Sequence, residues 1–523
     1  MDSSSFPIGK DVLSIIGVGI ALVLALPVVF ILNQIVGAIY RMTIGEWFTP
    51  WKHIPKVKQT DPLALFFGDF RAIKSQQPAD QHVKWMNELG PVYRYRHMFQ
   101  VHRILLADPK AMSYVLSPAK AYQYPKPEYT SAFLTAVLGE GLVSIEGEKH
   151  ARQRKIIAPA FAPGVIKEYQ PVVHRHAKAL VKKINEVIKE ENARRAGKFG
   201  ADHLLEGQAP SDRSVTLQDP AHQAVIDVLF WLSRTTLDII GEVGFSFMFD
   251  SLNHGDKDPL ANAMNVLMGA VLDLDLSTAI LVILSEKPGL KWIRYLPTSR
   301  RMRIKSAKKT VEEHAHVIVD RLRNEILAEN QGVSKDMFDD MGDSRPKSLV
   351  SRMIRANMAT DLKASERMSN AELMGQMTTL IIAGHETTAT QNSWALWLLA
   401  MHPEVQDKLR KVLQEAVAKE NAEKDDLPEE EQAIYEYQPV RDINSIKYLD
   451  DVVKECVRML PSIPSTLRVA LKDDVVPLSR PYKRVDGKGT YNSVFIPKGH
   501  ELFIPLNVVC LLYTSDAADE GLG

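Results

Sequence analysis

Cysteine is nearly absent from this sequence of 523 residues, which contains Cys456 and Cys510 and no others. Two cysteines provide no disulfide framework, so a small secreted protein held together by disulfides is excluded and a reducing compartment fits better. Net charge is lacking too, because 64 Lys and Arg residues balance 64 Asp and Glu residues. Without an excess of positive charge no overall field attracts nucleic acid, and we expect no nucleic-acid partner.

One long hydrophobic run stands at the N-terminus. Residues 12–32 contain no charged side chain, and about 20 apolar residues are enough to cross a bilayer core as a helix. The run exceeds the apolar region of a signal peptide, and Arg41 and Lys52 follow it, which favours a cytosolic remainder of the chain. We expect a single-pass anchor over residues 1–40, with the endoplasmic reticulum membrane as the default location.

Helical periodicity dominates the rest of the chain. Apolar spacing predicts helices over residues 165–191, 221–243, 304–330, 370–400 and 404–419. Residues 92–108 alternate and predict a strand pair. Prolines and basic residues predict a stiff, non-helical connector over residues 41–61, and two polar stretches, 193–214 and 420–439, read as surface insertions. The fold class expected is mainly α with a minor β-sheet, in one domain over residues 62–509.

An unusual combination of residues interrupts the helix predicted over residues 370–400. The segment AGHETT places the small pair Ala383 and Gly384 before an acid, Glu386, and a hydroxyl, Thr387. A glycine inside a helix costs about 1 kcal/mol relative to alanine, and a local violation of this kind is typical of a functional site. The missing side chain would let a flat group lie against the helix, while Glu386 and Thr387 would pass protons to it.

Two other interpretations of AGHETT are a kinked core helix and a zinc protease. The first has about even odds, because short motifs often match by chance. The second requires a second histidine four residues after His385, and position 389 is alanine. The zinc site therefore fails.

Two further segments carry charged residues at helical spacing. Glu455 and Arg458 lie three residues apart and share a helix face, before a proline-bounded exit that leads to Arg468. In GEKHARQRKIIAPAF, His150 and Arg154 share one face, while Arg152 and another cation lie on a second face. Taken alone, the Glu455–Arg458 spacing is usually a solvated ion pair, and the second segment is a common kind of basic surface helix.

In their order and spacing the three motifs resemble the cytochrome P450 superfamily, and the fungal, membrane-anchored members in particular. The resemblance implies a haem-thiolate monooxygenase that inserts one oxygen atom from O2 into an apolar substrate, with electrons from an NADPH-dependent flavoprotein reductase. The implied haem-binding residues are His150, Arg154, Ala383, Gly384 and Arg468. The implied catalytic residues are Glu386 and Thr387, and the implied structural ion pair joins Glu455 to Arg458.

The resemblance also implies an axial cysteine within a Phe-x-x-Gly-x-Arg-x-Cys-x-Gly loop, and the sequence contains no such loop. Cys456 lies inside the ExxR helix and Cys510 borders the tail of residues 510–523, which has the composition of a non-native extension. We therefore expect an incomplete fold at the C-terminus, no metal ligand and an inactive chain. The alternative is a non-catalytic, membrane-tethered helical protein that only binds partners.

The segment 122–142 resembles the variable loop that covers the substrate pocket in this superfamily. Its aromatic residues are explained equally well by ordinary loop packing. In the same way, Arg152 and Lys155 would present positive charge to an acidic partner such as a reductase.

Overall fold

The chain divides into two compact units in this computed structural model, Met1–Pro127 with Ile463–Gly523, and Glu128–Ser462. We call them unit 1 and unit 2 and describe each by itself. The structure describes residues 29, 32–74, 80–195, 225–254, 259–272, 281, 292–293, 296–330, 348–358, 366–424, 440 and 442–506.

Unit 1 contains both β-sheets. The four-stranded sheet has the order β1 (Val92–Arg96), β2 (His102–Leu106), β6 (Glu501–Pro505) and β3 (Ser465–Val469), and β4 (Asp474–Lys483) pairs with β5 (Thr490–Ile496). The β2 and β6 strands run parallel, whereas β1 with β2 and β3 with β6 are antiparallel. The predicted strand pair over residues 92–108 is confirmed. Unit 1 also contains helices α2 (Ile44–Phe48), α3 (Ala64–Phe67), α4 (Phe70–Lys74), α5 (Asp80–Leu89) and α6 (Pro109–Leu116).

The core of unit 1 is built from chain segments that are far apart in the sequence. Ile104 and Leu106 from β2 pack with Leu502 and Ile504 from β6, and all four are almost completely buried. Because β6 lies between β2 and β3, the sheet cannot form until both ends of the chain meet.

The segment before the sheet differs from the predicted connector. Residues 44–48 form α2, and its Glu46 forms ion pairs with Arg94 and Arg96 of β1 and lies 3.4 Å from Lys56 Nζ. The expectation of a non-helical connector is therefore wrong at its start. A carboxylate with three cationic partners makes helix formation here favourable, although proline-rich sequence follows.

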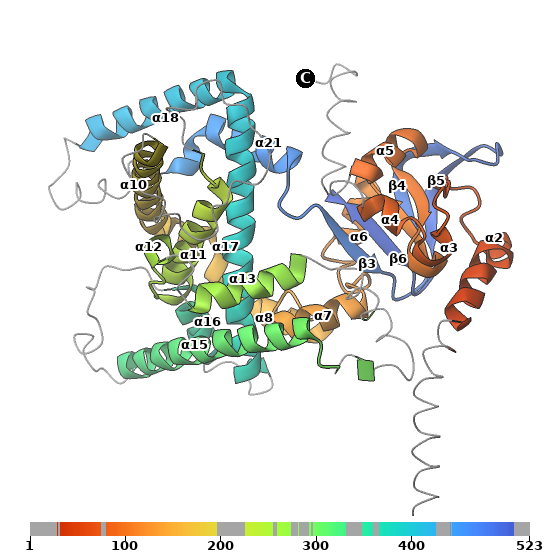
Figure 1. Cartoon of the computed structure of the whole chain (residues 1–523), viewed down its shortest axis with the longest axis horizontal. Coiled ribbons are helices and arrows are strands. Elements are labelled where there is room, and N and C mark those ends of the chain that lie inside the picture. Colours follow the sequence, from red (N-terminus) through yellow and green to blue (C-terminus); the bar gives the residue numbers. More distant parts are fainter. Residues whose placement is uncertain are drawn as a thin grey trace, which may run out of the picture. The chain divides into compact units, whose positions relative to one another are not determined.

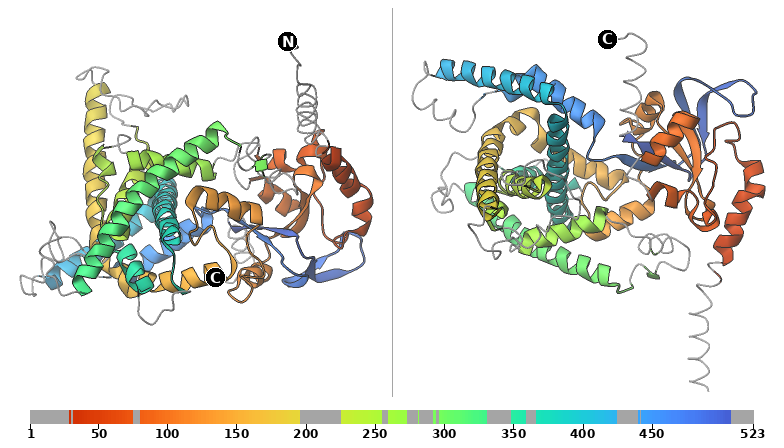
Figure 2. Two further views of the ribbon diagram at one scale, coloured as in Figure 1. Left: turned by 90° about the horizontal axis from the view of Figure 1, so that it is seen from below. Right: turned by 45° about the horizontal axis from the view of Figure 1, so that its top comes forward.

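Among its described residues, unit 2 contains helices joined by loops and no strand. Its helices are α7 (Glu128–Leu138), α8 (Gly147–Ile157), α9 (Pro163–Glu168), α10 (Gln170–Arg195), α11 (Val228–Phe245), α12 (Ser251–His254), α13 (Pro259–Leu272), α15 (Ser299–Asn330), α16 (Leu349–Met358), α17 (Asn370–Met401), α18 (Pro403–Lys424) and α21 (Lys447–Met459). Figure 1 and Figure 2 show α17 running through unit 2 with α11 beside it.

Most helix predictions agree with the structure. The helices predicted over residues 304–330, 370–400 and 404–419 are confirmed as α15, α17 and α18. The helix predicted over residues 165–191 is two helices, α9 and α10, which meet at Tyr169. The helix predicted over residues 221–243 begins later, at Val228, because Asp227 caps it by accepting from the Phe230 amide. Most of the two predicted insertions lies outside the described residues.

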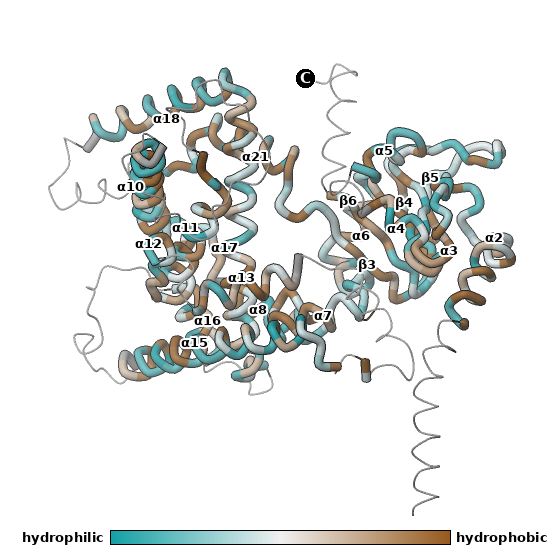
Figure 3. Tube along the Cα trace, viewed as in Figure 1, coloured by the Kyte–Doolittle hydropathy of each residue, from teal (hydrophilic) through white to brown (hydrophobic). Residues whose placement is uncertain are grey.

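One face of α15 shows how regularly spaced apolar residues form part of the core of unit 2. Figure 3 shows hydrophobic and hydrophilic residues alternating along this helix. Ala307, Val311, Ala315 and Ile318 are spaced three or four residues apart and are all buried in the main core of unit 2. An apolar stripe of this spacing is what fixes a helix against its neighbours.

The prediction of a transmembrane helix is corrected here. Within the described residues, no helix combines the length and the apolar character needed to cross a membrane. The hydrophobic run itself, residues 12–32, lies almost entirely outside the described residues. The predicted endoplasmic reticulum location stays a prediction.

Candidate functional site

The AGHETT segment lies in the middle of α17 and is partly open on one side. Ala383 is exposed, Thr387 is half-buried and His385 is buried. The Thr387 hydroxyl donates a hydrogen bond of 2.6 Å to the Ala383 carbonyl oxygen. Its single proton is thereby used within the helix, and its oxygen lone pairs remain available to accept a hydrogen bond from a group outside.

Gly384 has a packing role that the sequence did not reveal. A Cβ atom at this position would lie 2.8 Å from the Cδ1 and Cγ1 atoms of Ile240 in α11. The missing side chain therefore lets α11 approach α17, and the neighbouring Ala383 supplies the open, flat edge. Contact of either residue with a haem stays a prediction.

The predicted anion-binding helix is α8, and its charged residues point in two directions. Arg154 is exposed, and its side chain makes no hydrogen bond or ion pair with the described residues. His150 is half-buried, on the same face. Arg152 instead pairs with Glu372 of α17 and donates a 2.6 Å hydrogen bond to the Arg367 carbonyl oxygen. Arg152 is therefore engaged inside unit 2, which corrects its predicted role in docking a partner. Lys155 is exposed.

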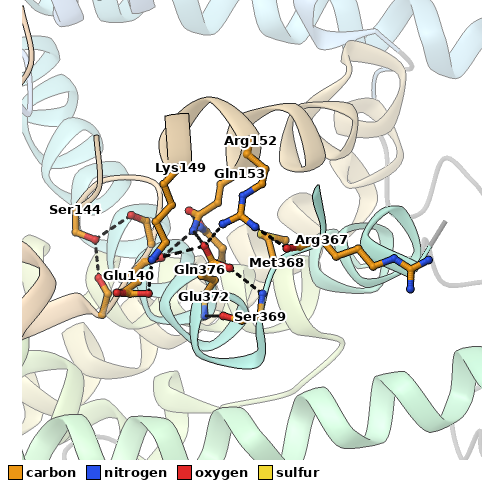
Figure 4. Close-up of polar contacts among 12 residues, drawn as sticks. Glu140, Ser144, Lys149, Arg152, Gln153, Arg367, Met368, Ser369, Glu372 and Gln376 are labelled. Atoms are coloured by element: carbon orange, nitrogen blue, oxygen red, sulfur yellow. Dashed lines mark hydrogen bonds and ion pairs between the residues drawn. The ribbon is translucent and has the colours of Figure 1, made fainter. Parts of the chain in front are cut away.

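Figure 4 shows that the Arg152–Glu372 pair belongs to a larger polar cluster between α8 and the start of α17. Gln153 and Gln376 are almost completely buried, and the Gln376 amide donates to the Gln153 side-chain oxygen. Gln153 in turn donates to Glu372 at 3.2 Å and to the Glu140 carbonyl oxygen at 3.1 Å. A buried polar cluster whose members are mutually bonded fixes the position of the two helices.

Electrostatics in this cluster favour an ionised Glu372. Burial alone raises the pKa of Glu372, but hydrogen bonds from Ser369 and Gln153 and the charge of Arg152 outweigh it and lower the pKa. The same carboxylate completes a capping box with Ser369 at the N-terminus of α17. Ala383 lies eleven residues further along the helix, or about 16 Å at 1.5 Å per residue.

The second charged motif connects to α17 through the loop that follows it. In α21, Arg458 donates two hydrogen bonds, of 2.6 and 2.7 Å, to the Glu455 carboxylate. Just beyond the helix, the Ser462 hydroxyl donates to the Thr387 carbonyl oxygen at 2.9 Å and lies 3.1 Å from the Gln391 side-chain oxygen. The exit from the ExxR helix is therefore bonded to the threonine of AGHETT.

Arg468 lies on β3 and belongs to unit 1, whereas the other predicted site residues belong to unit 2. Its guanidinium donates to the Thr466 hydroxyl at 2.5 Å and to the Leu467 carbonyl oxygen at 2.7 Å. The convergence of Arg468 with Arg154 on one anionic group stays a prediction.

The structure describes one of the two cysteines. Cys456 is buried in α21, and burial raises the pKa of its thiol, with a smaller contribution from the Glu455 charge. A thiol in these surroundings is a poor source of the thiolate that binds iron. Cys510 lies outside the described residues. A haem against α17, and the absence of an axial thiolate from this chain, both stay predictions.

Sequence reasoning missed the residues that connect the motifs: Gln153, Glu372, Gln376, Gln391 and Ser462. The capping box of Ser369 and Glu372 was readable from the S-x-x-E spacing. The partners of these five residues in distant segments could not be predicted, because contacts between residues more than 70 positions apart leave no periodic pattern in the sequence.

Comparison with known proteins identifies the family. The family model described as "Cytochrome P450" matches residues 58–199 and 212–507. The chain is 31% identical over 469 residues to cytochrome P450 monooxygenase 205 of Postia placenta, covering 90% of this chain and 75% of that protein. It is also 31% identical to cytochrome P450 monooxygenase claQ of Ampulloclitocybe clavipes, covering 85% of this chain and 71% of that protein.

A third relative, the ganoderic acid synthetase CYP5150L8 of Ganoderma lucidum, is 27% identical over 446 residues. The expectation of a fold that is incomplete at the C-terminus is withdrawn, because the family model matches through residue 507. A match of this extent, with relatives at 31% identity over most of both chains, shows that this chain belongs to the cytochrome P450 family.

Proposed function

We propose that this chain has the haem-binding and proton-delivery residues of a haem-thiolate monooxygenase, an enzyme that inserts one oxygen atom from O2 into an apolar organic substrate. We also propose that the chain is inactive by itself, because its sequence contains no axial-cysteine loop. The observation that carries the proposal is the half-open edge of α17, where Thr387 bonds back to the Ala383 carbonyl oxygen and the side chain of the preceding residue, Glu386, is partly exposed. An acid and a hydroxyl with free lone pairs, next to a flat and exposed alanine, suit proton delivery to a bound oxidant.

When bound, a haem with a thiolate ligand supplies the oxidising chemistry, which favours cleavage of the O–O bond. In unit 2, Ala383 and Arg154 would hold this group, with Ala383 beside the ring and Arg154 at a carboxylate; Arg468 of unit 1 would be a further carboxylate-binding residue. The guanidinium of Arg154 is exposed and has no hydrogen-bond or ion-pair partner among the described residues, which supports this role, because arginine binds carboxylates through two parallel hydrogen bonds.

The protein's own contribution is the handling of protons. The Thr387 oxygen accepts a hydrogen bond from a bound group or a water molecule, while its own O–H donates to the Ala383 carbonyl oxygen. Glu386, whose side chain is 21% exposed, exchanges protons with solvent and passes them along this edge of α17. Electrons would come from an NADPH-dependent flavoprotein reductase, and the exposed Lys155 is the remaining cation of the predicted docking face.

Haem uptake by the purified chain tests the proposal. We expect one haem per chain in a titration followed by absorbance, and about tenfold weaker binding in Arg154→Ala, since hydrogen bonds to charged groups contribute about 1.5–3 kcal/mol. Lys155→Ala, an exposed cation on the next position of α8, is the matched control and should bind haem normally. A chain that takes up no haem would favour the non-catalytic alternative.

The ligand of the iron is tested separately in the reduced, carbon monoxide-treated protein. We propose that Cys456 is not the axial ligand, so Cys456→Ala should leave the spectrum of the haem-loaded chain unchanged. We expect the red-shifted band of thiolate ligation to be missing. A band that is present and is lost in Cys456→Ala would contradict both statements, and one lost only in Cys510→Ala would identify Cys510 as the ligand.

A further inference from the structure

His385 is the residue of AGHETT to which the proposed function gives no role. It lies between Ala383 and Thr387 in the sequence, but unlike them it is buried, with only 1% of its surface exposed. A histidine in a helix interior is often a simple core residue. Here the ring is held by a specific bond and faces a carboxyl group, which sets it apart from ordinary packing.

The hydrogen bonds of His385 define which ring nitrogen carries the proton. Nδ1 lies 2.9 Å from the Ile381 carbonyl oxygen. A carbonyl oxygen only accepts hydrogen bonds, so Nδ1 must be the donor and must carry a proton. Burial lowers the pKa of His385, which favours the neutral ring. In a neutral ring with a proton on Nδ1, the other nitrogen, Nε2, has a lone pair and can only accept.

The lone pair of Nε2 is directed toward the predicted acid. Nε2 lies 3.7 Å from Oε2 of Glu386, which is slightly beyond hydrogen-bond distance. A small rotation of the half-exposed Glu386 side chain brings the atoms into contact. The backbone of His385 is fixed as well, because the Thr236 hydroxyl of α11 donates to its carbonyl oxygen at 2.9 Å.

Other acidic groups near this part of α17 have partners of their own. On α11, Asp238 accepts from two backbone amides at the start of α12, and Glu242 pairs with side chains of α10. On α21, Glu455 pairs with an arginine of the same helix. Glu386 is the charged group whose carboxylate raises the pKa of the His385 ring, against the larger lowering by burial.

We propose that His385 is a positioning residue that accepts a hydrogen bond from protonated Glu386 through Nε2 and so holds this acid ready to deliver its proton. The inference rests on the proposed function, in which Glu386 is the proton donor. During delivery the Glu386 O–H bond breaks, the proton passes to an acceptor on the open side of α17, and the carboxylate takes up a new proton from solvent. His385 stays neutral and keeps its proton on Nδ1 throughout.

Nitrogen NMR of the full chain, with labelled histidine, tests the proposal without any haem. The chain has 15 histidines, so the signals of His385 are assigned by their loss in His385→Gln. We expect the Nδ1-protonated form, and a step in the Nε2 shift that depends on the Glu386 carboxyl. The step should be lost in Glu386→Gln, whose amide does not titrate.

The matched control is Glu404→Gln, which removes the carboxylate beside the exposed His402, where Oε1 lies 3.4 Å from Nδ1. This variant should keep the step at His385. A ring protonated at Nε2, a native chain without the step, or a step that persists in Glu386→Gln would each overturn the proposal. Because the measurement needs no cofactor, its failure is distinct from a failure of haem uptake, which bears on the proposed function.

Discussion

Two glycines of α17 meet different kinds of neighbour, and this difference decides how each would tolerate a side chain. A Cβ at Gly375 would lie 2.7 Å from the backbone N and C atoms of Glu140, in the loop that crosses the helix. A Cβ at Gly384 would lie closest to side-chain atoms of Ile240, at 2.8 Å from Cδ1 and Cγ1 and 3.5 Å from Cβ. A backbone segment held by its own hydrogen bonds cannot move aside, whereas an isoleucine side chain can rotate.

We therefore expect Gly375→Ala to lower the free energy of unfolding by about 2 kcal/mol or more, because overpacking outweighs the gain of about 1 kcal/mol in helix propensity. Gly384→Ala should stay within about 1 kcal/mol of the native chain, since the two effects offset each other. Denaturant unfolding followed by circular dichroism compares the variants. Equal losses for both glycines would show that the Glu140 loop does not press on α17 as described.

At the scale of elements, the polar cluster between α8 and α17 fixes the register of the two helices, which the apolar core alone does not. Apolar contacts tolerate small shifts along a helix axis, but a carboxylate that accepts from Arg152, Gln153 and Ser369 fixes one register. The helix with the predicted anion-binding Arg154 is thereby held at a set distance from the helix with Thr387.

Replacing Glu372 with glutamine tests this connection. Its pKa is lowered in the folded chain, so its contribution is fully present above the pKa of about 4.3 for an unfolded glutamate and is lost as the pH falls. We expect Glu372→Gln to lower the free energy of unfolding by about 2 kcal/mol at pH 7, because it leaves Arg152 without its partner in a buried site.

The difference between Glu372→Gln and the native chain should narrow below about pH 4.3. The control is Glu148→Gln on α8, where the carboxyl is exposed and its removal should change stability by less than about 0.5 kcal/mol. A pH-independent difference for Glu372→Gln would show that packing, and not charge, accounts for the loss.

At the scale of the whole molecule, each unit has a core of its own. Leu502 of β6 is completely buried in a cluster that joins residues from the two ends of the chain, and Leu373 of α17 is buried to the same degree in the main cluster of unit 2. Among the described residues, neither cluster contains residues of the other unit. A substitution in one core should therefore destabilise its own unit more than the other unit.

Hydrogen exchange read by mass spectrometry checks this division. Leu502→Ala should cost about 2–5 kcal/mol and speed exchange in β1 and β2, with little change in α17. Leu373→Ala, its counterpart, should speed exchange in α11 and α17 and leave the β-sheet of unit 1 protected. Uniform acceleration throughout the chain in either variant would mean that the two units unfold as one.

The sequence by itself determined the local features of this protein. Apolar spacing located α15, α17 and α18, alternation located β1 and β2, and the ordered motifs indicated the cytochrome P450 family before any comparison. These features are readable because each depends on residues a few positions apart. The same local view failed at α2, where a helix is stabilised by arginines of a strand some 50 residues away.

Only the tertiary structure decided which side chains meet. It turned Arg152 inward to Glu372, set Ile240 against Gly384, bonded Ser462 to Thr387 and aimed the His385 ring at Glu386. A hydrogen bond between distant segments depends on how whole helices pack, and a linear pattern contains no record of that packing. For this reason the composition of the candidate site followed from the sequence, while the roles of its members followed from their contacts.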